Sequence, residues 1–283
     1  MLSDFQRVQV LSEALPFIQK FSGKTIVIKY GGSAMQNQVL KNKVIEDILF
    51  LSHIGLKPVL IHGGGPTINH WLNKLNITSQ FRQGIRVTDS TTMEIVEMVL
   101  VGKVNQELVA LMNKKKGKAI GLSGKDAQLI IATRFFDQGD NFVGKISHVN
   151  IDIIDVLAQQ GYIPIIASVA GSQDGQAYNI NADTVAGAVA AELKAEKLIL
   201  LTDTPGILSN INNASSLIRS LDSSRVSSLK EKNIISGGMI PKVDCCMQAL
   251  QDGVKSAHII DGRIEHALLL EILTNDGIGS MLI

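Results

Sequence analysis

The sequence predicts an α/β fold, a three-layer αβα sandwich around a mostly parallel sheet, and two observations support this prediction. Short runs of β-branched residues alternate with helical patterns along nearly the whole chain of 283 residues, and such an alternation favours a parallel sheet covered by helices. The apolar runs also lack an inside–outside alternation, which is typical of strands buried on both faces. This length suits one large α/β domain or two modest ones.

The individual elements follow from these patterns in chain order. The β-branched runs predict strands at residues 24–30, 57–63, 118–124, 162–170, 196–203 and 256–262. Apolar residues at helical spacing predict helices at residues 38–54, 89–113, 149–160, 182–194, 240–252 and 263–274. Residues 126–148 break the alternation and are expected to form a β-hairpin, whereas the Asn- and Ser-rich segment 209–224 is expected to be a surface loop.

The composition argues against several classes of protein. The formal net charge is +1, so electrostatics gives no reason to expect a nucleic acid or a membrane surface as a partner. No apolar run approaches the roughly 18 to 20 residues of a membrane-spanning helix, and residues 1–21 lack the features of a secretory signal, so we expect an amphipathic helix there. The adjacent Cys245 and Cys246 are poorly spaced for a disulfide or a metal site, and we interpret them as small apolar residues in a reducing compartment.

The candidate chemistry lies where strands end, because ligands of open α/β sheets bind outside the carboxyl ends of the strands. The first strand ends close to Lys29, and Gly31 and Gly32 follow, which places an ammonium group beside backbone amides. The second strand runs into the glycines at 63–65 and then Pro66, which suits the first turn of a helix. Amides at the positive end of a helix dipole fit an anion, although a tight turn that uses glycine only to avoid strain is the alternative.

Three familiar glycine motifs do not match. The "GKT" and "GKD" runs lack the first glycine of a phosphate-binding P-loop, and the glycines that start at Gly63 lack the third glycine of the dinucleotide fingerprint. The "HGGG" run occurs without the G-x-S-x-G elbow of serine hydrolases. Hydride transfer and serine hydrolysis therefore lose their main support.

Charged and amide side chains gather at further strand and helix ends. Arg86 could hold a substrate carboxylate in a fork geometry, or it could be a surface arginine in a turn. Asn179, Asn181 and Asp183 precede or open a helix that needs only one such cap. Lys242 stands in the first turn of another helix, where the dipole disfavours a cation unless an anion lies nearby. Lysines, an arginine, an aspartate and glycine loops are what phosphoryl transfer needs, because that reaction depends on charge neutralisation.

Six motifs in this order resemble the amino acid kinase superfamily and, within it, the N-acetyl-L-glutamate kinases: "KYGGSAM", "HGGGP", "GIRVT", "NINADTVAG", "TDTPGIL" and "GGMIPKV". The resemblance covers nearly the whole chain. It implies the amino acid kinase fold over residues 23–283, with an acetylglutamate-binding half at about 23–178 and an ATP-binding half at about 179–283.

The resemblance also implies a role for each site residue. Lys29 and Lys242 would stabilise the transferred phosphoryl group, and Asp183 would hold both lysines in place. Acetylglutamate would be bound, with the arginine on its α-carboxylate, by Gly64, Gly65, Arg86 and Asn179. The nucleotide would be bound by Gly31, Gly32, Asp203, Gly206, Leu208, Ser236 and Gly237.

The reaction implied is transfer of the γ-phosphoryl group of ATP, with Mg²⁺, to the γ-carboxylate of N-acetyl-L-glutamate in arginine biosynthesis. A carboxylate is a nucleophile at neutral pH, so no general base is needed, and Mg²⁺ would be held mainly by phosphate oxygens and water, so no protein ligand is expected. An aspartate, glutamate or carbamate kinase is the alternative within this class. A non-catalytic amino-acid sensor on the same fold is the alternative outside it, and it would be expected to have lost a lysine or Asp183.

The N-terminal and C-terminal segments resemble those of the arginine-inhibited members of the family. In residues 1–22, apolar side chains lie along one helical stripe, and Pro16 suggests a kink or break. The helix could fold back on its own domain, but the resemblance implies an oligomerisation helix of a hexamer and an L-arginine site near His258, Glu271 and Gly277. It also makes a PII-type signalling protein a candidate partner. Frequent Ile, Asn and Lys hint at an AT-rich genome, so the expected location is a bacterial cytoplasm or a plastid stroma.

Overall fold

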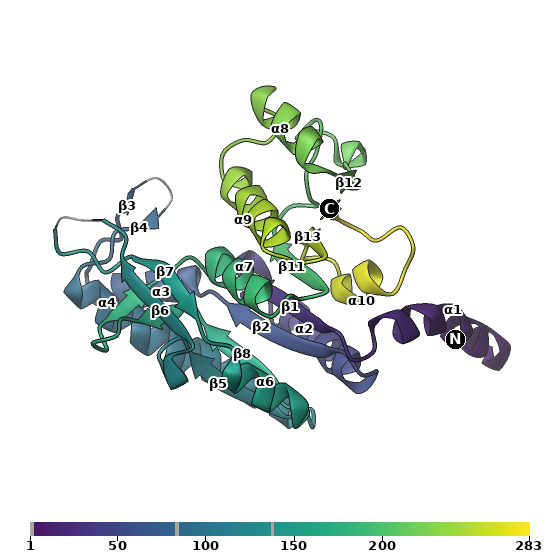
Figure 1. Ribbon diagram of the computed structural model, residues 1–283, viewed down its shortest axis with the longest axis horizontal. Coiled ribbons are helices and arrows are strands. Elements are labelled where there is room, and N and C mark those ends of the chain that lie inside the picture. Colours follow the sequence, from purple (N-terminus) through teal and green to yellow (C-terminus); the bar gives the residue numbers. More distant parts are fainter. Residues whose placement is uncertain (1–2, 83–84, 137–138) are drawn as a thin grey trace.

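The computed structural model describes residues 3–82, 85–136 and 139–283, and within them the chain forms an eight-stranded sheet (Figure 1). The strand order is β12 (Ser220–Leu221), β14 (Ser280–Leu282), β13 (Ser256–Asp261), β11 (Lys197–Thr202), β1 (Thr25–Tyr30), β2 (Lys57–His62), β8 (Ile163–Ala167) and β5 (Ala119–Ser123). The strands from β13 to β5 run parallel, whereas β14 pairs antiparallel with β13. The prediction of a mostly parallel sheet is therefore confirmed.

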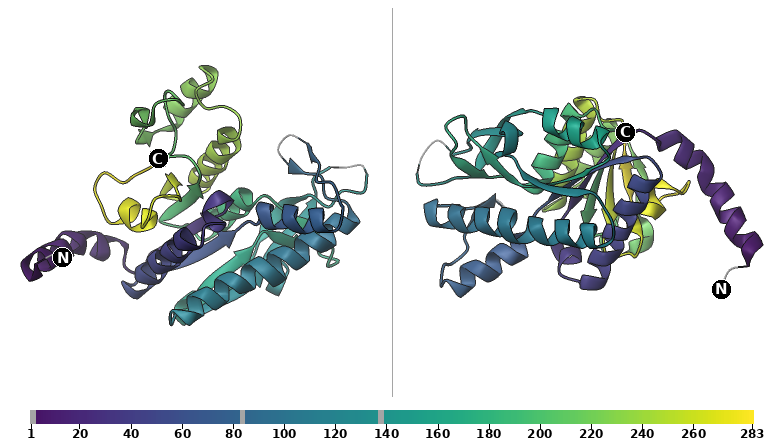
Figure 2. Two further views of the ribbon diagram at one scale, coloured as in Figure 1. Left: turned by 180° about the vertical axis from the view of Figure 1, so that it is seen from behind. Right: turned by 90° about the horizontal axis from the view of Figure 1, so that it is seen from below.

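Helices cover both faces of this sheet (Figures 1 and 2). One face carries α2 (Gln38–His53), α3 (Gly65–Lys74), α4 (Ser90–Glu97), the π-helix η2 (Met98–Asn105), α5 (Gln106–Lys114) and α10 (Ala267–Ile272). The other face carries α6 (Asp152–Gln159), α7 (Ala182–Glu192), α8 (Ser223–Glu231) and α9 (Met239–Gln251). The three-layer αβα arrangement is thus the one predicted.

Each face of the sheet packs into its own apolar cluster, and β1 shows how its side chains are divided between them. Ile26, Ile28 and Tyr30 belong to the cluster beneath α2 and α5, whereas Val27 belongs to the cluster beneath α7 and α9. Because successive side chains of a strand point to opposite faces, Lys29 points toward α7. Its position in the strand therefore decides which helix layer the lysine meets.

A smaller four-stranded sheet has the order β10 (Ala177–Asn179), β9 (Val169–Gly171), β6 (Ile130–Arg134) and β7 (Gly144–Val149). Strands β6 and β7 pair antiparallel, so the predicted hairpin at 126–148 is confirmed, although residues 137–138 of its tip lie outside the described residues. Strands β3 (Phe81–Arg82) and β4 (Ile85–Arg86) form a third, two-stranded sheet. In Figure 1 these strands lie at the same end of the molecule as α3 and α4.

Several boundaries differ from the predictions. The strand expected at 162–170 is interrupted at Ser168 and contributes β8 and β9 to two different sheets. The long helix expected at 89–113 consists of α4, the π-helix η2 and α5 in succession. The loop expected at 209–224 contains a 3₁₀ turn at Ala214–Ser216, strand β12 and the start of α8. At Ser168, pairing with two different sheets overrides a local pattern that looked uniform.

The N-terminal helix α1 (Asp4–Phe21) projects from one end of the molecule (Figures 1 and 2). A capping box of Ser3 and Gln6 fixes its start. Apolar side chains lie exposed along it, with Phe5 78% and Leu11 65% accessible. The helix continues through Pro16 to Phe21, so of the expected kink or break, the break does not occur. Its role in oligomerisation stays a prediction. None of the helices in the described ranges is both long and apolar enough to cross a membrane.

Candidate active site

Lys29 lies near the carboxyl end of β1, with its side chain only 11% exposed. A Cβ atom placed on Gly31 would lie 2.9 Å from the Lys29 Nζ atom, so glycine leaves the room that the ammonium group occupies. Gly32 has a φ of +72°, in the left-handed region that glycine adopts without strain. The two glycines therefore let the backbone turn tightly around the charged end of Lys29.

Asp183 lies in the first turn of α7 and contacts both predicted lysines. Its Oδ1 atom is 2.9 Å from the Lys29 Nζ atom, and its Oδ2 atom is 2.7 Å from the Lys242 Nζ atom. The N-cap of α7 is Asn181, whose Oδ1 atom accepts from the Asp183 amide at 2.8 Å. Capping is therefore done by the asparagine, and the aspartate carboxylate is left to pair with the lysines.

Lys242 lies in the first turn of α9, where the helix dipole disfavours a cation. The ion pair with Asp183 offsets that cost, because it places a carboxylate directly against the ammonium group. The Lys242 side chain is 23% exposed, about twice as much as that of Lys29. Of the two lysines, Lys242 is thus the one nearer to solvent.

The three charged groups form a cluster with two positive charges against one negative charge. Burial alone would raise the pKa of Asp183, but the charges of Lys29 and Lys242 outweigh burial and hold that pKa below its ordinary value. The carboxylate therefore stays ionised, and the cluster keeps one uncompensated positive charge. Such a cluster at strand ends attracts an anion and neutralises charge that develops on it.

The glycine loop after β2 leads straight into α3. Gly64 is the N-cap of this helix and offers no side-chain cap, and Gly65 begins it. A Cβ atom on Gly64 would lie 2.6 Å from the Leu100 Cδ2 atom of the π-helix, so no larger residue fits without a shift. The first amides of a helix have no intrahelical acceptor. This loop therefore supplies N–H donors at the positive end of α3, as the sequence predicts.

Arg86 is a largely buried guanidinium at the end of β4, in a motif whose Gly84 lies outside the described residues. Its NH1 atom donates to the Ser79 Oγ atom at 2.7 Å, and its Cζ atom lies 4.7 Å from the centre of the Phe81 ring. Burial lowers its pKa. Across the described ranges, no acidic side chain lies within 4.0 Å of it. A buried cation of this kind suits a carboxylate brought by a ligand.

Asn179 ends β10 and is joined to the Arg86 segment through Thr88. The Asn179 Nδ2 atom donates to the Thr88 Oγ1 atom at 3.1 Å, and that hydroxyl donates to the Arg86 carbonyl at 2.9 Å. Two predicted substrate-binding residues that are far apart in sequence are thus brought together. The structure therefore places all four predicted acceptor-binding residues on β4, β10 and the start of α3.

These features point to one family. The sequence model of the amino acid kinase family matches residues 24–261, most of the chain. The chain belongs to the amino acid kinase family.

Full-length relatives narrow the subgroup. An acetylglutamate kinase from Gracilaria tenuistipitata var. liui is 65% identical over 284 residues, which cover 100% of both chains. One from Nostoc punctiforme is 59% identical over 277 residues, which cover 98% of this chain and 93% of the relative. The resemblance to the acetylglutamate kinases is therefore confirmed.

Solved structures agree on the fold. An N-acetylglutamate synthase from Neisseria gonorrhoeae, in complex with coenzyme A and N-acetyl-glutamate, superposes with a TM-score of 0.84 at 26% identity over 97% of this chain. The chain spans 63% of that synthase. A carbamate kinase from Giardia superposes with a TM-score of 0.67 at 17% identity, over 92% of this chain and 99% of that chain, and it shows the shared fold alone.

In this amino acid kinase, the residues predicted for the nucleotide lie after β11 and before α9. Asp203 follows β11 directly. Gly206 has a φ of +139°, and a Cβ atom on it would lie 2.7 Å from the Ser280 Oγ atom. Leu208 pairs with Leu217 in an isolated bridge. Ser236 and Gly237 are exposed and precede the helix that carries Lys242. The contacts of these five residues with a nucleotide stay predictions.

The predicted regulatory residues lie in one cavity of about 450 Å³ between the N-terminal and C-terminal helices. We call it the α1–α10 pocket, and it is lined by Phe17, Lys20, Phe21, Lys197, Arg219, His258, Glu271, Asp276, Gly277 and neighbouring residues. The structure thus brings His258, Glu271 and Gly277 together, as expected. It adds Lys197, which sequence reasoning missed because a lysine that opens an apolar run looks like an ordinary strand end.

Hydrogen bonds organise the floor of this pocket. The His258 Nδ1 atom lies 2.6 Å from the Glu271 Oε1 atom, and the Lys197 Nζ atom lies 3.0 Å from the His258 Nε2 atom. The Glu271 Oε2 atom accepts from the amides of Ile278 and Gly279 at 2.7 and 3.0 Å. Burial lowers the pKa of His258. An ammonium group only donates, so the His258 Nε2 atom accepts from Lys197 and the Nδ1 atom donates to Glu271, which is the arrangement of a neutral ring.

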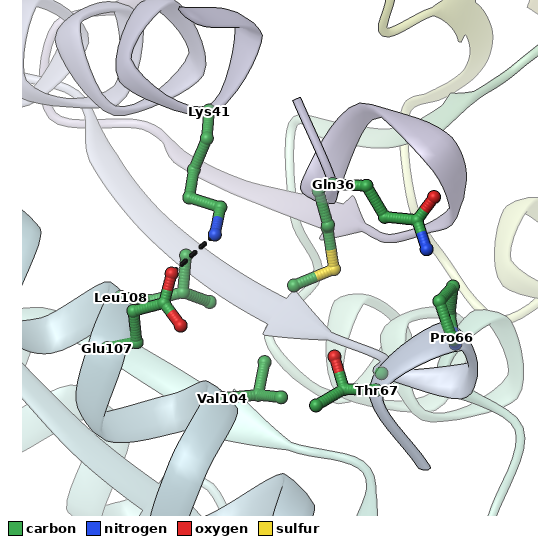
Figure 3. A pocket seen from close by; sticks show the side chains of 9 residues that line it. Gln36, Lys41, Pro66, Thr67, Val104, Glu107 and Leu108 are labelled. Carbon is green, nitrogen blue, oxygen red and sulfur yellow. Dashed lines mark hydrogen bonds and ion pairs between the residues drawn. The ribbon is translucent and has the colours of Figure 1, made fainter. Parts of the chain in front are cut away.

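A second cavity, of about 310 Å³, borders the glycine loop and is shown in Figure 3. Lys41 of α2 and Glu107 of α5 point toward each other across it, with the Lys41 Nζ atom 2.5 Å from the Glu107 Oε1 atom. Gly64, Pro66 and Thr67 line the same cavity. The pair joins two helices of one layer beside the loop, and its partners are 66 positions apart, so no local pattern could have found it.

The carboxylate nearest to the two lysines is not free to hold a Mg²⁺ ion. Within the described ranges no group of three or more His, Cys, Asp and Glu side chains is placed to hold a metal ion. Both oxygens of Asp183 already face ammonium groups. Oxygen ligands for Mg²⁺ would therefore come mainly from phosphates and water.

Proposed function

We propose that this amino acid kinase transfers the γ-phosphoryl group of ATP to the γ-carboxylate of N-acetyl-L-glutamate, giving N-acetyl-L-glutamyl 5-phosphate in arginine biosynthesis. The observation that carries the proposal is Asp183 held between Lys29 and Lys242 at the ends of β1, α7 and α9. The buried Arg86 beside Asn179 and Thr88 supports an acceptor with a second carboxylate. The full-length acetylglutamate kinase relatives support the choice of acceptor.

In the proposed step a γ-carboxylate oxygen attacks the γ-phosphorus in line with the leaving group. A bond forms between that oxygen and phosphorus, the bond to the β–γ bridging oxygen breaks, and ADP leaves with the electron pair. Lys29 and Lys242 neutralise charge on the transferred group, and the amides of Gly64 and Gly65 hold the attacking carboxylate. No proton has to move, which agrees with a site built around lysines and amides. Mg²⁺ on the phosphates would supply further neutralisation of the leaving group.

The test is a transfer assay in which hydroxylamine traps the acyl phosphate as a hydroxamate. ATP is offered with N-acetyl-L-glutamate, L-glutamate, L-aspartate or carbamate in parallel, and carbamate transfer is followed through ADP release. We expect the highest kcat/KM for N-acetyl-L-glutamate. A higher kcat/KM for any of the other acceptors would overturn the proposal.

We further propose that L-arginine inhibits the enzyme by binding in the α1–α10 pocket, and that α1 joins subunits into a hexamer. The pocket carries the positive side chains of Lys20, Lys197 and Arg219 together with the acidic side chains of Glu271 and Asp276. Groups of both signs suit an amino acid, which itself carries both signs. The exposed apolar residues of α1 supply a surface for another subunit.

Deleting residues 1–20 tests this regulation. We expect an active dimer that no longer responds to arginine, whereas the full-length chain forms a hexamer that arginine inhibits. Light scattering gives the mass and the transfer assay gives the inhibition. A full-length dimer indifferent to millimolar arginine would contradict the regulatory proposal and leave the catalytic one standing. A PII-type protein as partner, and a bacterial cytoplasm or plastid stroma as location, belong to the same proposal.

A further inference from the structure

Asn105 joins the π-helix to three neighbouring strands of the sheet. It is the last residue of η2, and its side chain is buried. Its Nδ2 atom lies 2.8 Å from the Ile165 carbonyl of β8, 3.3 Å from the Leu122 carbonyl of β5, and 3.1 Å from the His62 Nε2 atom at the end of β2. π-Helical turns are rare and often occur at functional sites. This one places an amide donor under the strand that leads into the glycine loop.

These contacts fix the tautomer of His62. Two carbonyl oxygens surround the Asn105 nitrogen, so that atom must be the donor NH₂ group. An amide nitrogen cannot accept a hydrogen bond, and its two hydrogens are shared among these three neighbours. The His62 Nε2 atom is therefore an acceptor, and the Nδ1 atom carries the proton, which it donates to the Gly63 carbonyl at 3.0 Å. Burial lowers the pKa of His62 to about 4, in keeping with a neutral ring.

The bond from His62 also sets the direction of the next amide. In a planar trans peptide the C=O and N–H groups point in opposite directions. With the Gly63 carbonyl directed at the His62 ring, the Gly64 N–H is directed away from it. The Gly63 amide donates to the Tyr30 carbonyl at 3.0 Å, so both ends of this glycine are anchored. The Gly64 N–H thus emerges from the loop in one defined direction.

The surrounding packing leaves little freedom to this arrangement. A Cβ atom on Gly121 would lie 1.9 Å from the Asn105 Oδ1 atom, so the amide oxygen lies close against the backbone of β5. Leu100, in the same π-helix, reaches within 2.6 Å of where a Gly64 Cβ would be. The π-helix therefore bounds the glycine loop directly through Leu100 and indirectly through Asn105 and His62.

We infer that His62 and Asn105 are positioning residues that aim the Gly64 N–H at the acceptor carboxylate, through the hydrogen bonds from Asn105 to His62 and from His62 to Gly63. The inference rests on the proposed function, because it takes the Gly64 amide as part of the acceptor site. It assigns a purpose to the fully buried side chain of His62.

Two isosteric variants of His62 separate this role from simple packing. In His62→Asn the side-chain nitrogen occupies the Nδ1 position and can still donate to Gly63. In His62→Gln the amide reaches the Nε2 position, so it can accept from Asn105 but no longer donates to Gly63. We expect His62→Gln to lower kcat/KM for acetylglutamate by about fivefold or more, the worth of one hydrogen bond. His62→Asn should recover most of that loss, and KM for ATP should stay within about twofold in both variants.

Asn113 provides a matched control on the next helix. Its Nδ2 atom donates to the Ala119 carbonyl at 3.1 Å, and its Oδ1 atom accepts from the Ala119 amide at 2.8 Å, so it clamps α5 to the other end of β5. Asn105→Ala should reduce kcat/KM for acetylglutamate, whereas Asn113→Ala should lower Tm and leave kcat/KM unchanged.

The outcomes distinguish this inference from the proposed function. If the unaltered protein does not phosphorylate acetylglutamate, the proposed function is wrong. If the unaltered protein is active but both His62 variants lose activity equally, or lose it toward ATP and acetylglutamate alike, the positioning role is wrong. A His62 variant that fails to fold is recognised by its thermal unfolding transition. In that case the comparison of kcat/KM between Asn105→Ala and Asn113→Ala tests the positioning role.

Discussion

The cluster of Lys29, Asp183 and Lys242 and the α1–α10 pocket both lie against the central part of the sheet, where Lys29 comes from β1 and the pocket residues Lys197 and His258 come from β11 and β13. The two places differ in the face of the sheet, in the end of the strands and in charge. Lys29 lies near the carboxyl end of β1 and faces α7, whereas Lys197 opens the neighbouring β11, in register with Ile26, and belongs to the other face. In the cluster one carboxylate contacts two ammonium groups. In the pocket the ammonium of Lys197 contacts a neutral histidine, and a carboxylate contacts the other side of that ring.

This difference indicates what each place can bind. The cluster keeps a net positive charge and suits a phosphoryl group whose negative charge is spread over several oxygens. The pocket offers both signs and suits a zwitterion. Because the two places lie on opposite faces of the sheet, substitutions in one should leave the chemistry of the other intact. Substitutions at either place test that separation.

The largest effect is expected from the cluster lysines. Lys29→Ala and Lys242→Ala should each lower kcat by about 10²-fold or more and change KM much less, since both cations act mostly on transition-state charge. Steady-state kinetics with both substrates measures this. Lys230→Ala is the control, because Lys230 also pairs with an aspartate of α9 but lies on the surface. Near-normal turnover in either cluster variant would remove that lysine from the mechanism.

Arg86 should affect the acceptor alone. Arg86→Ala should raise KM for acetylglutamate by about 10-fold or more, the scale of a charged hydrogen bond, and leave KM for ATP nearly unchanged. Arg86→Lys keeps the charge but loses the fork geometry, so it should recover little of the affinity for acetylglutamate that Arg86→Ala loses. The initial-rate matrix over both substrates is the measurement. An equal rise in both KM values would show that Arg86 does not read the acceptor carboxylate.

In the α1–α10 pocket, Glu271→Gln should weaken arginine inhibition by about 10-fold. The substitution removes the negative charge that is expected to face the guanidinium group of the bound inhibitor. The kcat should stay within about twofold, since Glu271 and the cluster lie on opposite faces. Glu265→Gln is the control, as Glu265 is an exposed carboxylate just before α10. Inhibition curves with arginine give the answer. A collapse of kcat in Glu271→Gln would mean that the two places are not separate.

A feature of the site could be predicted from the sequence when the residues that form it are close together in the chain. The apolar strand before Lys29 and the glycines after it are adjacent in the chain, so their pattern predicts both the strand and its chemistry. The pairing of Asp183 with two lysines joins three distant segments, and only the resemblance to a family suggested it.

Other features had no signal that a single sequence can carry. Asn105 looks like a polar residue on an amphipathic helix, and its partners on β2, β5 and β8 are fixed only when the sheet assembles. The interruption at Ser168 falls inside a uniformly apolar run, so strand propensity could not predict that β8 and β9 enter different sheets. In both cases tertiary hydrogen bonds determine the structure.

The smallest effect concerns the stability that the cluster itself contributes. Because the folded pKa of Asp183 is depressed, its ion pairs stabilise the fold above the ordinary carboxyl pKa of 3.8, and this contribution is lost as pH falls through the lower folded value. Asp183→Asn should therefore cost about 2 kcal/mol at pH 7, less than for a wholly buried pair because Lys242 is partly exposed. The difference from the unaltered protein should shrink as the pH falls below about 4. Urea unfolding midpoints from pH 7 to pH 3 measure this difference in stability. A difference that is constant over that range would show that Asp183 stabilises the fold through its packing and not through its charge.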